Sequence, residues 1–423
     1  MSKADLVITG KAYVGGAVLR VAVAVEGEEI ACVSSPASAP PAEEVVELDE
    51  GKLLLPGMVD MHVHMRDLEL SYKEDWYTGT LSALAGGVTF VADMPNTRPA
   101  TNSVRGLEVK LREASRKALV DYGIYAGLPS DLKELEALLS RGVLGLKLYP
   151  EDLGSPILER ALELCAMEGV PVVVHPEDRE IIEKRGRVPE AEIRALEKMI
   201  LLASRTGAHL HFTHVSLRES VRRILEGKLS GLSLSMDATL HHMLLDEGVS
   251  RRLGPLAAVN PPLRSGDDRL AILSAASKCL LDAVASDHAP HTLEEKVAGA
   301  PGFPGLELAL PLLLTLVEDG LLPLSSLELY SSRPAKILGL RKGSLAPRWD
   351  ADLVVADLKR EGVVSGSKMR SKAKFTPFEG FALRAVVERV YLRGSLAYDD
   401  GEVLLKPGSG RLVRGGRRNW TRD

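Results

Sequence analysis

Hydrophobic and polar positions divide this chain into two β-like ends and a long middle in which two periods alternate. Residues 1–55 and 352–410 contain short runs of alternating apolar and polar residues, separated by glycines, and this pattern predicts strands. In the middle, short apolar runs typical of buried strands alternate with segments whose apolar residues recur at helical spacing. The predicted strands are 58–64, 88–94, 121–128, 143–149, 170–175, 209–214, 232–236 and 282–286. The predicted helices are 72–85, 103–119, 131–139, 157–168, 189–204, 218–229, 268–280 and 307–317.

This order of elements is that of a parallel α/β protein. Eight strands that alternate with helices fit a (β/α)8 TIM-like barrel better than an open doubly wound sheet. The matching patterns of the two ends predict that they pair into one small β-sandwich domain. We therefore expect residues 1–55 to form the N-terminal part of that domain, 56–345 the barrel, and 346–423 the C-terminal part with a tail.

Composition excludes several classes of partner. A net charge of −5 gives no electrostatic footprint for nucleic acid, and we interpret the basic stretch 411–422 as a solvated strand and tail. No apolar run approaches the ~20 residues of a membrane span, so we expect no membrane contact. Three widely spaced cysteines favour a reducing cytoplasm over a disulfide framework. No glycine-rich nucleotide-binding pattern follows a predicted strand.

All ten histidines lie between His62 and His291. This grouping indicates a functional site rather than histidines distributed at random along the chain. His62 and His64 are two residues apart at the end of the first barrel strand, so they point to the same side, together with Asp60. A lone histidine is more often a satisfied core residue. Further candidate ligands, however, lie in or at the ends of later strands, where barrel enzymes build their sites. They are Lys147, His175, His214 and Asp287.

Four imidazoles and a carboxylate suit a borderline divalent ion such as zinc, and their number is sufficient for two ions. Two such ions ~3.5–4 Å apart lower the pKa of a shared water and polarise a carbonyl. Lys147 would lie beside these cations, so it must be neutral or modified. Carbamylation would turn it into a carboxylate long enough to span both ions. The alternatives are a lysine neutralised by burial or paired with an acid such as Asp287.

Five segments, 56–66, 93–99, 145–149, 285–291 and 301–307, resemble the motifs of dihydroorotases in the cyclic amidohydrolase superfamily. The similarity extends from about residue 50 to 395. Any one of these motifs would also be shared with hydantoinases or allantoinases, but the combination is not. An enzyme of the hydantoinase or allantoinase type is the alternative to a dihydroorotase. The resemblance implies zinc-dependent, reversible hydrolysis of the cyclic amide of (S)-dihydroorotate to N-carbamoyl-L-aspartate in de novo pyrimidine (UMP) biosynthesis.

The resemblance also implies roles for single residues. One Zn²⁺ would be held by His62, His64 and Asp287. The other would be held by His175 and His214, and N6-carboxylysine at Lys147 would bridge the two ions. Asp287 would also act as general base and general acid.

Substrate recognition is predicted to depend on Arg66, whose planar guanidinium can bind a carboxylate through two parallel hydrogen bonds. The resemblance adds Asn96 and His291 to this carboxylate site. It places further contacts around the pyrimidine ring, at Asn260, Phe303 and Gly305. Taken alone, Arg66 is better interpreted as a surface arginine and Asn96 as the start of an Asx-turn, and the candidate metal ligands favour the functional roles instead.

A second pair of histidines, His241 and His242, follows Asp237. We interpret the pair as the polar rim of a loop, and the alternative is an extra, weaker third metal on Asp237 and His242. The expected partners are the small-molecule substrates, while a homo-oligomer and an association with aspartate transcarbamoylase stay open. A non-catalytic scaffold is disfavoured, because every ligand position is filled.

Overall fold

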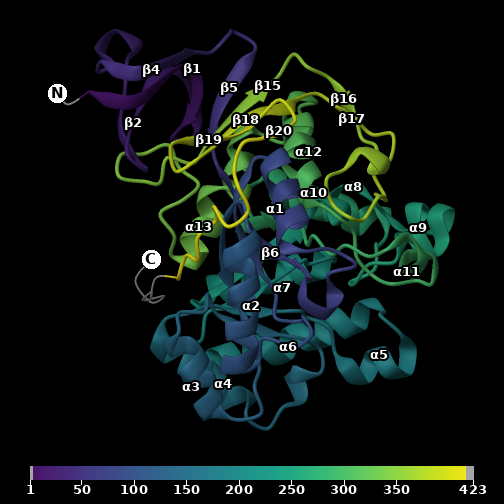
Figure 1. Ribbon diagram of the computed structural model, residues 1–423. Coiled ribbons are helices and arrows are strands. Elements are labelled where there is room, and N and C mark those ends of the chain that lie inside the picture. The colour runs from purple at the N-terminus through teal and green to yellow at the C-terminus, as the bar shows by residue number, and fades with distance from the viewer. Residues whose placement is uncertain (1–2, 416–423) are drawn as a thin grey trace.

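Figure 1 shows the computed structural model, which describes residues 3–415. The predicted barrel strands form two parallel arcs. The first arc consists of β6 (Met58–Val63), β7 (Val88–Asp93) and β8 (Asp121–Ile124). The second consists of β9 (Ala126–Gly127), β10 (Leu146–Leu148), β11 (Val172–Val174), β12 (Leu210–Phe212), β13 (Leu234–Thr239) and β14 (Ala283–Ala285). The predicted strand 121–128 is divided between β8 and β9 at Tyr125.

Backbone hydrogen bonds join the two arcs on both sides. On one side the Tyr125 N–H donates to the Asp93 carbonyl (3.0 Å). On the other side the His64 N–H donates to the His288 carbonyl (2.8 Å), next to a parallel bridge between Val63 and His288. The arcs therefore close into a barrel, and the predicted (β/α)8 fold is confirmed.

Longer helices separate the strands as the apolar spacing predicts. They are α1 (Trp76–Ala85), α2 (Val104–Lys117), α3 (Leu132–Ser140), α4 (Leu158–Glu168), α6 (Pro189–Thr206), α7 (Arg218–Leu229), α10 (Gly266–Ser277) and α12 (Leu306–Glu318). Helices α3, α4 and α6 gather at the end of the molecule opposite the terminal strands β1 and β4 (Figure 1).

Several short helices were not predicted. They are α5 (Arg179–Arg185), α8 (Leu240–Leu244), α9 (Glu247–Leu253), α11 (Leu293–Val297) and α13 (Ser332–Leu338). Each spans only one or two turns, which is too short for helical spacing to stand out in a sequence. The expectation of a loop with a polar rim at His241 and His242 was wrong, because both histidines are buried in α8.

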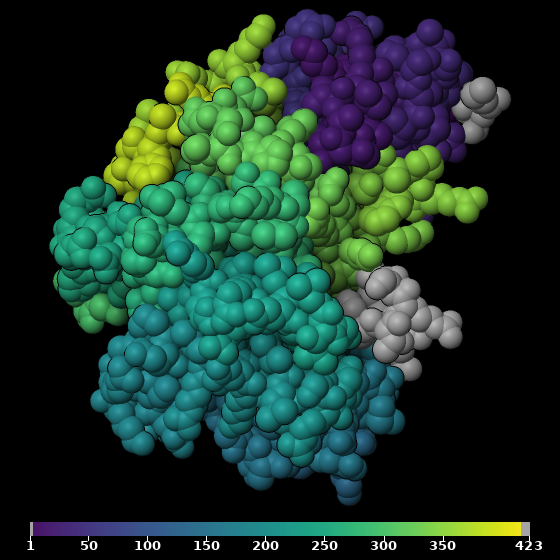
Figure 2. All heavy atoms as spheres, turned by 180° about the vertical axis from the view of Figure 1, so that it is seen from behind, coloured from purple at the N-terminus to yellow at the C-terminus, as the bar shows by residue number. Residues whose placement is uncertain are grey.

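Strands from both ends of the chain pair into one sheet, as their similar patterns predict. This nine-stranded sheet of the described residues comprises β1 (Ala4–Val14), β2 (Ala17–Glu26), β3 (Glu29–Ser34), β4 (Ala42–Glu47), β5 (Lys52–Pro56), β15 (Leu353–Asp357), β18 (Val386–Leu392), β19 (Ser395–Asp399) and β20 (Glu402–Val403). β5 and β15 join the two ends, with Leu54 opposite Val355. β16 (Gly362–Val363) and β17 (Ala382–Leu383) form a separate pair. Figure 2 shows the surfaces of the two ends side by side.

The sheet passes into the barrel at Gly57, between β5 and β6. The Gly57 N–H donates to the Asp352 carbonyl (2.7 Å). A Cβ atom at this position would lie 2.2 Å from Thr89 Oγ1, so the close approach requires glycine. The chain runs directly from the sheet into the barrel at Gly57. The proposed domain boundaries at 55/56 and 345/346 stay a prediction.

The C-terminal segment returns to the barrel. The Tyr122 N–H donates to the Arg411 carbonyl (2.9 Å), and the Val413 N–H donates to the Tyr122 carbonyl (2.8 Å). The first part of the basic stretch is therefore a docked strand-like segment, while Arg417 and Arg418 of the predicted tail lie outside the described residues. In residues 3–415 no helix has the length and apolar character needed to cross a membrane.

Candidate active site

A buried carboxylate, Asp60, holds the ends of strands β6 and β14 together. Its oxygens accept hydrogen bonds from the backbone N–H groups of His62 (3.1 Å) and Ser286 (3.2 Å) and from the Tyr330 hydroxyl (2.7 Å). Burial raises the pKa of Asp60 to about 6. Because Asp287 follows Ser286 directly, Asp60 fixes the backbone from which both His62 and Asp287 project.

Three of the predicted metal ligands converge at these strand ends. His62, His64 and Asp287 offer ligand atoms that all lie within 4.8 Å of one another. Asp287 Oδ1 is 3.4 Å from His62 Nε2 and 3.2 Å from His64 Nε2. Burial lowers the pKa of both imidazoles well below the usual range, so both are neutral and can offer a lone pair to a cation. Burial also raises the pKa of Asp287 to about 7, while the neighbouring Lys147 opposes this shift.

The other two predicted histidine ligands line the same cavity. The ring centroids of His175 and His214 are 4.5 Å apart, and that of His214 is 5.3 Å from that of His62. His175 Nε2 lies 2.6 Å from Glu177 Oε2, which leaves Nδ1 for a metal. His214 Nδ1 is buried without a hydrogen-bond partner among residues 3–415. Burial lowers the pKa of both imidazoles.

Lys147 is fully buried in the middle of β10, and its Nζ atom has no hydrogen-bond partner among the described residues. A buried ammonium group without a partner is costly. Burial accordingly lowers the pKa of Lys147 to about 7. The hydrogen-bonded pair with Asp287, which the sequence left open, is not formed. Lys147 is therefore suited to be a neutral amine or a modified side chain.

These side chains line a cavity of about 720 Å³ at the C-terminal ends of the barrel strands. Arg66 lies in its wall and is only 8% exposed. Its Nε donates to the Pro290 carbonyl (3.3 Å), and its Nη2 lies 3.2 Å from His291 Nε2. Burial lowers the pKa of His291 to about 4, so this imidazole is neutral at neutral pH. Asn260 also lines the cavity, as predicted from the sequence.

Asn96 lines the cavity and also has a role that the sequence did not indicate. Its Oδ1 atom lies 2.7 Å from His64 Nδ1. An amide oxygen can only accept, so His64 Nδ1 carries the hydrogen and Nε2 keeps its lone pair toward Asp287. Such a partner orients a metal ligand and fixes its tautomer.

Phe303 and Gly305 do not reach the cavity wall, which in this segment is formed by Pro301 and Gly302. The Phe303 ring is buried against His241. The Gly305 N–H donates to His288 Nδ1 (3.2 Å). Both residues therefore support the wall from behind, and direct substrate contacts at these two positions stay a prediction.

Asp237 and His242 do not line this cavity either. His242 Nδ1 is 2.8 Å from the Thr239 hydroxyl, and His242 Nε2 is 3.1 Å from the Pro261 carbonyl. Both nitrogens are thus engaged in hydrogen bonds, and Asp237 binds residues of β12 and the loop after it. The described geometry gives no support to the third metal.

Comparison with known proteins places this site in a family. The model of the amidohydrolase family matches residues 53–397. The dihydroorotase of Pyrococcus furiosus is 37% identical over 384 residues, which cover 88% of this chain and 89% of that protein. The dihydroorotase of Pyrobaculum aerophilum is 38% identical over 415 residues, with coverage of 96% and 99%. This chain belongs to the amidohydrolase family.

Solved structures with the same fold include other amidohydrolases. The L-hydantoinase (dihydropyrimidinase) of Arthrobacter aurescens has a TM-score of 0.92 at 26% identity, covering 97% of this chain and 100% of that chain. A further relative, the multifunctional protein CAD of Squalus acanthias, is 34% identical over 388 residues, which are 89% of this chain but 16% of that protein. The predicted enzyme class, a metal-dependent cyclic amidohydrolase, is confirmed.

Sequence reasoning missed several side chains of this amidohydrolase site. Glu177 and Arg187 lie behind His175, with the Arg187 guanidinium bonded to the Glu177 carboxylate. Arg187 also lines the cavity, together with Tyr149 and Glu151 from the segment after β10. Glu177, Tyr149 and Glu151 lie just after strands, but that position does not distinguish a cavity residue from a surface loop, and Arg187, which follows α5, had no such signal.

Proposed function

We propose that this amidohydrolase is a dihydroorotase, which reversibly hydrolyses the cyclic amide of (S)-dihydroorotate to N-carbamoyl-L-aspartate. The observation that carries the proposal is Arg66, whose guanidinium is buried in the cavity of the candidate metal ligands. It hydrogen-bonds to the Pro290 carbonyl and approaches His291, and both partners are uncharged. A buried guanidinium with such partners suits a substrate with a carboxylate. Dihydroorotate has this group, and the archaeal relatives carry the same activity in their names.

The substrate carboxylate would lie between Arg66 and His291. Asn96 uses its amide oxygen for His64, so its amide nitrogen remains able to donate to the same carboxylate. Asn260 and the backbone of Gly302, which line the cavity, would contact the ring. These contacts orient the cyclic amide with its scissile carbonyl toward the histidines.

The ligand set fits two zinc ions. His62, His64 and Asp287 would hold one ion and His175 and His214 the other, with N6-carboxylysine at Lys147 between them. The neutral imidazoles and the unpartnered Lys147 Nζ support this arrangement. When bound, the metals would supply an activated water and a polarised carbonyl.

Asp287 would move the proton during the reaction. Its carboxylate lies beside the ligand histidines at the same cavity, so it can accept a proton from the attacking water. It can then donate the proton to the amide nitrogen that leaves the ring. The same two proton transfers in reverse order accompany ring closure, so one carboxylate would be sufficient for both directions of the reaction.

An assay of the purified chain with L-dihydroorotate, zinc and bicarbonate tests the proposal. We expect turnover, and loss of about 10²-fold or more in kcat/KM for Arg66→Ala, because buried, hydrogen-bonded charge pairs are worth several kcal/mol. Arg98→Ala is the control, since this exposed arginine lies on the neighbouring loop after β7 and does not line the cavity. No turnover of L-dihydroorotate by metal-loaded protein would refute the proposal.

The structural similarity to the L-hydantoinase favours a second candidate, a hydantoinase or allantoinase type of amidohydrolase. Such a substrate has a cyclic amide but offers Arg66 no carboxylate. Turnover of hydantoin or allantoin that exceeds that of dihydroorotate, and that survives Arg66→Ala, would establish this alternative.

We further infer a place in de novo pyrimidine biosynthesis in the cytoplasm, which the three unpaired cysteines support. The much longer multifunctional relative of Squalus acanthias supports an association with other enzymes, and aspartate transcarbamoylase is the proposed one. Size-exclusion chromatography with light scattering, of the chain alone and mixed with that enzyme, tests both this association and a homo-oligomer.

A further inference from the structure

A row of polar side chains lies inside the barrel between β12 and β13. Side chains two residues apart in a strand point to the same side, so alternate residues of the two strands can face each other. His211 is paired with Ser235 in the strand register. Three members of the row, His211, Thr213 and Asp237, are fully buried. Barrel interiors are usually filled with branched apolar side chains, so a polar row here calls for a function.

Asp237 receives hydrogen bonds from three residues of this row and the loop beyond it. Its Oδ1 accepts from the His214 backbone N–H (2.6 Å), and its Oδ2 accepts from the Thr213 hydroxyl (2.9 Å). Oδ2 also lies 2.8 Å from His211 Nε2. A carboxylate offers acceptors only, so the hydrogen of this last bond belongs to His211.

The direction of these bonds determines the tautomer of His62. The Thr213 hydroxyl lies between Asp237 Oδ2 and His62 Nδ1, 2.5 Å from the latter. Because its only hydrogen points to Asp237, Thr213 can only accept from His62. His62 Nδ1 therefore carries a hydrogen, and Nε2 keeps the lone pair that faces Asp287.

We propose that Asp237 is a positioning residue for the ligands of both metals. Through Thr213 it fixes the tautomer of His62, and through the backbone N–H it holds His214. His214 has φ of 42°, a left-handed conformation that residues other than glycine rarely adopt, so this N–H needs a strong acceptor. The inference rests on the proposed metal centre, and it gives Asp237 a role other than that of a metal ligand.

The row continues away from the metals and supplies a control. His211 Nδ1 lies 2.8 Å from the Ser235 hydroxyl, which in turn lies 2.8 Å from His209 Nε2. Among the hydrogen bonds of the described residues, these groups are connected to Asp237 through His211. Ser235→Ala removes a buried hydroxyl of the same row without touching Asp237, Thr213 or His62.

Asp237→Asn tests the proposal, because it reverses the hydrogen bonds at Oδ2 at unchanged shape, while the oxygen that remains still accepts from the His214 N–H. An amide nitrogen in place of Oδ2 donates to His211 Nε2, whose hydrogen moves to Nδ1, and to Thr213, whose hydroxyl then donates to His62 Nδ1. The imidazole hydrogen of His62 moves to Nε2, the atom that would bind zinc. We expect the zinc affinity of the full chain, measured by chelator competition, to fall by about 10–100-fold.

A second pair of variants keeps the test independent of Asp237 and of its effect on folding. Thr213→Val removes the hydroxyl at similar shape, and we expect the same loss of roughly 10–100-fold, whereas Thr213→Ser restores affinity to within about threefold. Ser235→Ala should bind zinc like the wild type. Imidazole ¹H–¹⁵N spectra of zinc-loaded protein should show a protected His62 Nδ1–H that Thr213→Val loses and Thr213→Ser keeps.

Unchanged zinc affinity in both Asp237→Asn and Thr213→Val, in a wild type that binds two zinc ions, would overturn the inference alone. An equal loss of affinity in Ser235→Ala would also overturn it, since any buried polar residue would then have the same effect. A wild-type chain that binds no zinc would overturn the proposed metal centre and the inference with it.

Discussion

At the scale of single residues, the sequence predicted the candidate metal ligands, because their spacing and their positions at strand ends determine where they lie. His62 and His64 are two apart at the end of a strand, and the remaining candidate ligands lie in or at the ends of other barrel strands, so the fold brings them together. The partners that orient these ligands were not predictable. Asn96 bonds to His64 and Thr213 to His62 across 32 and 151 residues of sequence, and no local pattern reports such contacts.

Lys147 gives the first prediction at this scale. If its carboxylated form joins two metals, Lys147→Ala removes the bridge but leaves the histidines in place. We expect metal content to fall below two per chain and kcat to fall by at least about 10³-fold, because the proposed metals would supply the activated water. Elemental analysis and the dihydroorotase assay measure both.

Short carboxylic acids provide the internal control for Lys147. Acetate or propionate can occupy the space left in Lys147→Ala and supply a bridging carboxylate, so part of the activity should return. Wild-type protein should not respond to these acids. If Lys147→Ala keeps both its metals and its activity, Lys147 is not the bridge.

His291 gives a prediction of pH dependence. Burial, helped by Arg66 and Lys73 and opposed by Glu295, lowers the pKa of His291 to about 4. Its pKa in the unfolded chain is ~6.5, so between these values the unfolded state binds the extra proton. The contribution of His291 to stability is therefore complete above about pH 6.5 and is lost as the pH falls toward 4.

Urea denaturation of wild type and His291→Gln at pH 7.5 and 4.5 isolates this contribution. Glutamine does not titrate, so the stability of the wild type relative to the variant should decrease by on the order of 2 kcal/mol at the lower pH. Parallel pH profiles of the two proteins would contradict the depressed pKa.

At the scale of elements, long periodic helices and apolar strands were predictable, whereas short helices and polar strand ends were not. The strand predicted at 232–236 extends in the structure to Thr239 as β13. The apolar pattern ends at Met236 because the next residue, Asp237, directs its carboxylate to His211 of β12 inside the barrel. Polar residues that face a barrel interior resemble the start of a loop in the sequence.

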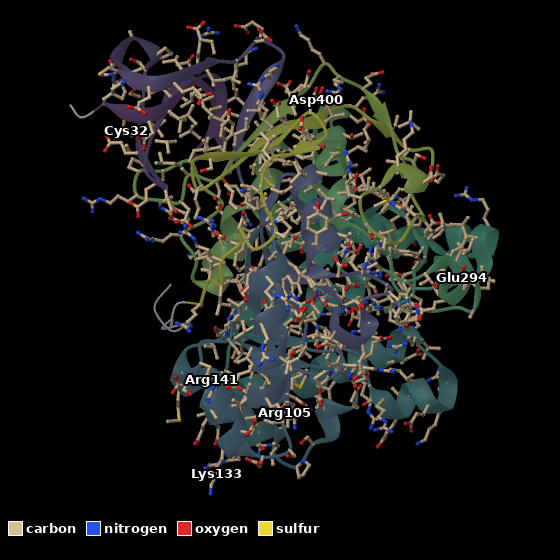
Figure 3. The ribbon with its side chains drawn as sticks, in the orientation of Figure 1. Cys32, Arg105, Lys133, Arg141, Glu294 and Asp400 are labelled. Atoms are coloured by element: carbon tan, nitrogen blue, oxygen red, sulfur yellow. The ribbon has the colours of Figure 1, made fainter. Side chains whose placement is uncertain are left out.

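Helix α3 gives a prediction at this scale. The Asp131 side chain accepts a hydrogen bond from the Glu134 N–H (3.0 Å) at the start of the helix. Because this bond satisfies a donor that the helix itself leaves unpaired, Asp131→Ala should cost about 1 kcal/mol of unfolding free energy. Lys133→Ala is the control, since Lys133 is exposed on the same turn and points away from the barrel (Figure 3). Equal effects of the two substitutions in urea denaturation would argue against the cap.

At the scale of the whole molecule, the sequence indicated that the two ends share a sheet but not which strands meet. Both ends have the same alternating pattern, yet the pairing of β5 with β15 depends on packing between segments about 300 residues apart. The sequence also did not predict the ionic cluster of Lys342, Asp121, Asp350 and Asp352, which joins the sheet to the barrel. Its charged residues look like ordinary surface residues in the sequence, and only the fold buries them together.

The centre of this cluster is Lys342, whose Nζ lies 2.8 Å from each of three carboxylates, Asp121 after helix α2, and Asp350 and Asp352 before β15. Burial lowers the pKa of Lys342, but the three carboxylates outweigh burial and hold the pKa above its usual range. Lys342→Met would take the cation away from Asp352, which is buried, and would leave Asp121 with Arg393. We expect a loss of about 3–5 kcal/mol in unfolding free energy, the usual cost of removing one partner of a buried ion pair.

The exposed Lys359→Met variant, which makes the same change of charge at the surface, should stay within about 0.5 kcal/mol of the wild type in urea denaturation. Adding Asp352→Asn to Lys342→Met removes one of the uncompensated charges and should recover part of the loss. A Lys342→Met protein as stable as Lys359→Met would mean that Lys342 contributes nothing measurable to holding the sheet and the barrel together. Recovery in the double variant would instead locate the coupling between barrel and sheet in this one buried lysine and its acids.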